Sequence, residues 1–133
     1  MVSFPSSLEN AIGILLVIIH VGLGLWAIVG FIEFFASQVP WPPLSNPLFP
    51  PAILLLQWTL ILTAALVFVP GYLMQWQLLP WAMVFVYAAM AALCAVETFG
   101  FLQNDSRFIA MAAEYIAYLA IIFFLFLTAT ERG

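Results

Sequence analysis

Residues 97–114 read ETFGFLQNDSRFIAMAAE, a short polar interruption between two long apolar runs. It holds four of the chain's eight charged residues, namely Glu97, Asp105, Arg107 and Glu114. The pattern predicts two hydrophobic helices joined by a tight turn at one membrane face. A carboxyl group inside such an apolar run is costly in lipid, so it is a functional-site hypothesis by default.

The composition of the 133-residue chain extends this prediction to the whole protein. Hydrophobic residues make up 67% of it, charged residues only 6%, and the mean hydropathy is +1.20. A soluble domain averages about 45–50% apolar and about 25% charged residues, so a membrane protein is favoured. The chain has no Lys and only two Arg, so it lacks the basic surface that nucleic-acid binding requires.

Proline-rich and polar breaks divide the apolar sequence into four segments. Prolines are dense between Val39 and Pro51, and Pro70-Gly71 and residues 103–106 mark two further breaks. We therefore predict an all-α polytopic membrane protein, a four-transmembrane-helix bundle that forms a single domain over residues 1–133. The expected helices span about residues 10–36, 51–69, 79–102 and 107–129.

Four crossings place both termini at one face and the proline-rich loop at the other. At about 1.5 Å per residue, Glu33, Gln57, Glu97 and Glu114 all lie within roughly 10 Å of the loop face. We expect one polar layer that binds a ligand or an ion. The alternatives are Glu side chains that reach out to water and a Gln57 that only bonds to a neighbouring helix.

Arg107 precedes Glu114 by seven residues, which brings the two almost onto one helical face and makes an ion pair feasible. One Arg cannot neutralise three carboxylates. Some of the carboxyls must therefore hold protons, or a bound cation must balance them.

His20 is predicted to lie near the bilayer centre, about 20 Å along the first helix from Glu33. Three roles stay open for it: a neutral imidazole bonded to a backbone carbonyl, an axial ligand of a porphyrin-type metal, or a proton relay. A haem held by two His of one chain is excluded because there is no second His. No hydrolase or di-iron motif is present, so we expect no enzyme activity.

The order of the segments resembles the DoxX-like family of small four-helix bacterial membrane proteins. The first helix ends in Gly30-Phe31-Ile32-Glu33, a proline-containing loop follows, and the second helix carries Gln57 where members often have Glu. The resemblance implies an accessory role near membrane redox or quinone chemistry.

Three functions fit these observations. The first is an accessory or assembly subunit of a larger respiratory or photosynthetic membrane complex. The second is an oligomeric proton- or cation-coupled carrier or channel that uses the Glu layer, and the third is a pigment- or quinone-binding protein holding quinone, chlorophyll or a haem-type group. The expected partners are lipid and other membrane subunits or further copies of the chain, in a bacterial cytoplasmic or thylakoid membrane. The orientation stays open because Arg107 and Arg132 fall on opposite faces.

Overall fold

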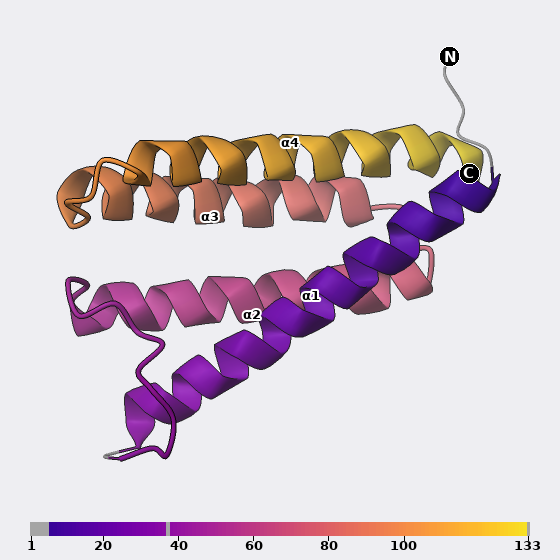
Figure 1. Ribbon diagram of the computed structural model, residues 1–133. Helices are drawn as coiled ribbons and strands as arrows, with labels where there is room; N and C mark the ends of the chain where they lie inside the picture. Colours follow the sequence, from indigo (N-terminus) through magenta and orange to yellow (C-terminus); the bar gives the residue numbers. More distant parts are fainter. Residues whose placement is uncertain (1–5, 37, 133) are drawn as a thin grey trace.

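The computed structural model describes residues 6–36 and 38–132 and consists of four helices, α1 (Ser6–Phe35), α2 (Pro51–Leu73), α3 (Leu79–Gly100) and α4 (Arg107–Arg132) (Figure 1). The predicted all-α class is confirmed, since these residues contain no strand. Each helix is long and apolar enough to cross a membrane. Residues 1–5, 37 and 133 of the predicted domain, and the side chains of Ser6 and of residues 129–132 (Arg132 among them), lie outside the described part.

The predicted end of the second helix at Pro70-Gly71 is wrong, because α2 continues to Leu73. Proline lacks a backbone N–H, but its carbonyl can still accept, and the amide of Met74 donates to the carbonyl of Pro70 at 2.9 Å. The helix stops where Gln75 takes a left-handed conformation with φ of 55°. Three other boundaries differ from the prediction by two to four residues: α1 begins at Ser6, α3 ends at Gly100 and α4 extends to Arg132. The end of α1 differs by one residue, and the starts of α2, α3 and α4 are as predicted.

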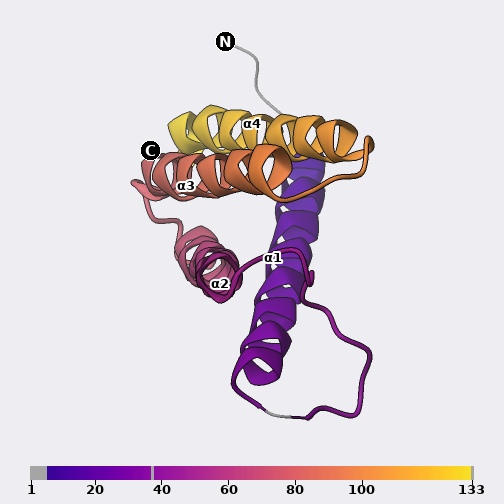
Figure 2. The same ribbon diagram turned by 90° about the vertical axis from the view of Figure 1, so that its left-hand side faces the viewer.

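Consecutive helices contact one another, α1 with α2, α2 with α3, and α3 with α4. Figures 1 and 2 show α3 and α4 lying side by side, while α1 crosses the other helices obliquely. The start of α1 and the end of α4 lie at one end of the molecule, as predicted, and the two long connections lie at the other. There the rings of Phe49 and Phe101 meet at a centroid distance of 6.2 Å, which ties the two connections together.

The main core lies toward the end that carries the start of α1. It joins buried side chains from all four helices, including Leu16, Phe68, Met83 and Leu125. A smaller cluster forms where α1 and α2 pack together, around Ala27, Trp58 and Ile61. Residues of α1 and α4, such as Leu16 and Leu125, share the main core, and Figure 1 shows α1 diverging from α3 and α4 toward the loop end.

Glycines permit the close contact between α1 and α2. A Cβ atom at Gly24 would come within 2.9 Å of the Cβ atom of Ala65. At Gly30 it would overlap ring carbons of Trp58, whose side chain is fully buried. Without a hydrophobic driving force between helices in lipid, such close backbone approach is a principal source of association.

We predict that Gly30→Ala destabilises the protein by about 1–3 kcal/mol, because the added methyl group forces the Trp58 ring from its site. The matched control is Gly22→Ala, where a Cβ atom meets nothing within 4 Å. This control should leave stability unchanged or raise it by up to about 1 kcal/mol, as Ala favours helix over Gly. Unfolding in mixed micelles measures both variants, and equal stability of the two would contradict the packing described.

Candidate functional site

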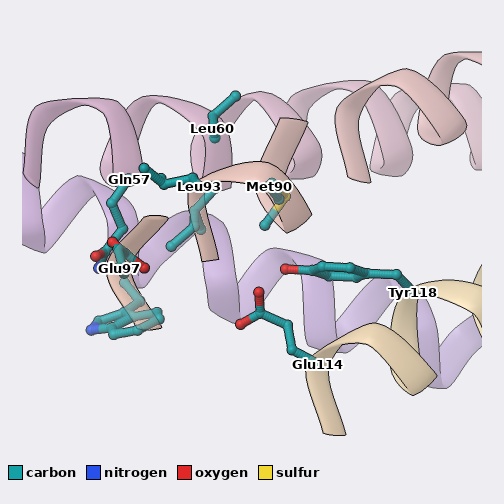
Figure 3. Close-up of a pocket in the computed structure, with 9 residues that line it drawn as sticks. Gln57, Leu60, Met90, Leu93, Glu97, Glu114 and Tyr118 are labelled. Carbon is teal, nitrogen blue, oxygen red and sulfur yellow. The ribbon is translucent and has the colours of Figure 1, made fainter. Parts of the chain in front are cut away.

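A cavity of about 230 Å³ opens between the four helices where α1 diverges from α3 and α4. Each helix contributes at least one polar or aromatic group to its wall: Trp26 from α1, Gln57 from α2, Glu97 from α3, and Glu114 and Tyr118 from α4. Apolar side chains of α2 and α3 complete the lining (Figure 3). We call this cavity the carboxyl pocket.

The two carboxyl groups come from helices that are adjacent in the chain, so the predicted turn between them positions both. In Figure 3, Gln57 and Glu97 group at one end of the pocket and Glu114 and Tyr118 at the other. Glu97 and Glu114 are close enough for their charges to interact. The Oε2 atom of Glu97 is buried, and no residue in the described part of the chain donates a hydrogen bond to it.

Glu114 belongs to a further polar group on the α3–α4 side of the pocket. Its carboxyl group adjoins the hydroxyl of Tyr118 and the thiol of Cys94. The Cys94 Sγ atom in turn lies 3.9 Å from the Oγ1 atom of Thr98, one turn along α3. Within the pocket itself, Gln57, Glu97, Glu114 and Tyr118 supply oxygen atoms that can accept hydrogen bonds or face a positive charge.

Glu33 does not belong to the predicted layer. It lies in the last turn of α1 and binds the proline-rich loop: the amides of Leu44 and Ser45 both donate to its Oε1 atom, at 3.0 and 2.8 Å. Leu44 also donates to Oε2 at 2.8 Å, and the Trp41 indole N–H does so at 3.2 Å. Position along α1 did not predict this contact, because a side chain this near a helix end can reach past that end. Glu33 thus organises the loop.

The ion pair between Arg107 and Glu114 is likewise not formed among the described residues. The guanidinium Nη1 atom donates to the carbonyl of Asn104 at 3.2 Å, and the group lies over the ring of Phe108 at 4.4 Å. Arg107 is the first residue of α4, so its side chain binds the backbone of the preceding turn. Among the residues that the structure describes, no basic side chain lines the carboxyl pocket.

His20 is 1% exposed and sealed within the core. Its Nδ1 atom lies 2.7 Å from the carbonyl oxygen of Leu16, which can only accept, so Nδ1 carries the proton. The Nε2 atom then accepts from the hydroxyl of Tyr87 at 2.6 Å, and the imidazole ring stacks on Phe68 at 4.0 Å. With both nitrogens occupied, this geometry corresponds to the neutral, carbonyl-bonded role and does not favour axial ligation of a metal.

Sequence reasoning missed the two tyrosines that connect His20 with the pocket. The ring of Tyr87 stacks on that of Tyr118 at a centroid distance of 4.7 Å and an angle of 11°. The position of Tyr118 carried a signal, because it lies four residues after Glu114 and so on the same face of α4. Nothing local marked Tyr87, since its partner lies 67 residues away.

The carboxyl pocket is a poor cage for Ca²⁺. Among the residues that the structure describes, no group of three or more His, Cys, Asp and Glu is placed to hold one. Ca²⁺ takes six to eight oxygen ligands, and the remaining walls here are aromatic or aliphatic.

This chain matches no protein-family model, no curated protein and no solved structure. The resemblance to the DoxX-like family therefore stays a prediction.

We predict that Glu33→Ala speeds hydrogen exchange at the amides of Leu44 and Ser45 roughly ten- to a hundredfold, because bonds to a charged acceptor contribute about 1.5–3 kcal/mol. Exchange of the protein in nanodiscs, followed by NMR, measures the effect. The control is Glu114→Gln, which changes the pocket and should leave both amides protected. Unchanged exchange in Glu33→Ala would show that other contacts hold the loop.

Proposed function

We propose that this protein is a small membrane carrier that binds protons or cations at Glu97 and Glu114. The observation that supports it is the carboxyl pocket itself, in which two carboxyl groups share a cavity within the spans and no basic side chain in the described part of the chain lines the wall. Isolated carboxylates at this depth are costly, so a proton or a bound cation must neutralise them. A carboxyl group that takes up and releases protons or cations is suited to coupled transport between the two membrane faces. The proposal includes no catalytic step.

The size of the cavity also supports a small ligand. Pockets for drug-sized molecules measure roughly 300–1,000 Å³, whereas this one measures about 230 Å³. A whole pigment ring would not fit without rearrangement, and His20 is engaged on both sides. We therefore rank pigment and quinone binding below cation binding. A bacterial cytoplasmic or thylakoid-type membrane is the proposed location.

A second proposal, an accessory subunit of a larger membrane complex, is favoured by the exposure of α4. Only 11% of the most apolar stretch of α4 is buried within the chain, against 28% of the corresponding stretch in each of the other helices. Ala110, Ala113 and Ala117 are exposed, and such small residues permit close approach of another helix. The two proposals are compatible.

Transport by purified protein in liposomes that enclose a pH-sensitive dye tests the first proposal. Under a sodium or potassium gradient, the native protein should change the internal pH. Both Glu97→Gln and Glu114→Gln should slow this flux at least about tenfold, since each removes a charge worth several kcal/mol in a low-dielectric site.

Glu33→Gln is the matched control, because it changes a carboxyl group of the loop and leaves the pocket intact. It should retain the native flux. Helix content and a monodisperse elution profile establish that each variant folds. A folded Glu97→Gln/Glu114→Gln double variant with native flux would overturn the proposal.

A further inference from the structure

A second cavity of about 270 Å³ lies along the contact between α3 and α4, and we call it the α3–α4 groove. Its lining is apolar and aromatic and includes Val84, Ala88, Tyr115 and Leu119. Ala88 and Leu119 are exposed, so the groove opens on the outer surface of the helix pair, which faces lipid in a membrane. The hydroxyl of Tyr115 donates to the carbonyl of Ala91 at 2.8 Å and joins the two helices within it.

Tyr118 lines both the α3–α4 groove and the carboxyl pocket. Its hydroxyl adjoins Glu114, while its ring stacks on Tyr87, which His20 holds through the 2.6 Å hydrogen bond. The side chain therefore forms a common wall between a polar interior cavity and an apolar groove that opens toward lipid. A ligand that passes from the groove to the pocket would have to displace this side chain.

The pocket has the chemistry of an ammonium site. Glu97 and Glu114 supply negative charge, and the buried Oε2 atom of Glu97 accepts no hydrogen bond in the described part of the chain. The aromatic rings of Trp26 and Tyr118 line the same cavity, and aromatic faces attract organic cations. An ammonium group provides the donor that the Oε2 atom of Glu97 lacks, and it tolerates the Met and Leu walls of the cavity.

We propose that the cation bound by the carboxyl pocket is a lipophilic ammonium compound, which enters from the bilayer with its chain in the α3–α4 groove and its head group between Glu97 and Glu114. This inference rests on the proposed function and specifies the ligand class of that same site. The groove would shelter the apolar body, and the pocket is large enough for the head group.

Binding of radiolabelled decylammonium to the protein in nanodiscs tests the proposal, with protein-free nanodiscs as the blank and decanol as the uncharged probe of equal length. The native protein should bind decylammonium saturably, with one site per chain, and should not bind decanol above the blank. Glu97→Gln/Glu114→Gln should abolish this saturable binding. Equal binding of decylammonium and decanol by the native protein would overturn the proposal.

Two variants test the route through the groove. Ala88→Phe fills it from α3 and Leu119→Trp fills it from α4, and each should weaken decylammonium binding at least tenfold. Ala89→Phe is the matched control, because Ala89 is the exposed neighbour of Ala88 and lines neither cavity. It should bind like the native protein. Native affinity in both folded groove variants would overturn the entry route and the placement of the chain.

Failure of this inference and failure of the proposed function give different results. If flux of inorganic cations or protons depends on Glu97 and Glu114 while decylammonium does not bind, the carrier stands and the ligand class is wrong. If the double Gln variant keeps native flux, the proposed function itself fails. In the groove variants, flux of protons should stay native because the pocket is unchanged.

Discussion

Lipid offers no hydrogen bonds, so each polar group within the spans must find its partner inside the protein. His20 meets this constraint most fully. Its ring joins three helices, because Nδ1 donates to a carbonyl of α1, Nε2 accepts from Tyr87 of α3, and the face stacks on Phe68 of α2. This contact fixes where the oblique α1 meets the other helices and holds Tyr87 against Tyr118 of α4.

The carboxyl pocket follows from that arrangement. Since α1 is held in the core near one end and crosses the bundle at an angle, space is left toward the loop end between it and the α3–α4 pair. Glu97 and Glu114 face that space without a basic partner, whereas Glu33 is satisfied by loop amides. The polar residues therefore divide into groups that the protein satisfies, such as His20 and Glu33, and groups that it leaves for a proton or a ligand.

The sequence was sufficient for features that depend on position along a helix. Four apolar runs with proline breaks predicted four helices, and depth from the turn at residues 103–106 placed Glu97 and Glu114 together. It was insufficient where side chains choose partners across the bundle or beyond a helix end. Glu33 binds the loop, Arg107 binds the turn before α4, and Tyr87 bonds to His20. Each of these contacts depends on helix rotation and tilt, which no local pattern encodes.

The state of the His20 ring tests this arrangement most directly. Solid-state NMR of the ¹⁵N-His-labelled protein in bilayers distinguishes protonated from unprotonated ring nitrogens. A neutral ring with the proton on Nδ1, and with Nε2 as a hydrogen-bond acceptor that changes its shift in Tyr87→Phe, is the expected result. Three results would contradict it: a proton on Nε2, a charged imidazolium at neutral pH, or an Nε2 shift that Tyr87→Phe does not change. In each case the His20 contact would not be what positions α1, Tyr118 and the pocket relative to one another.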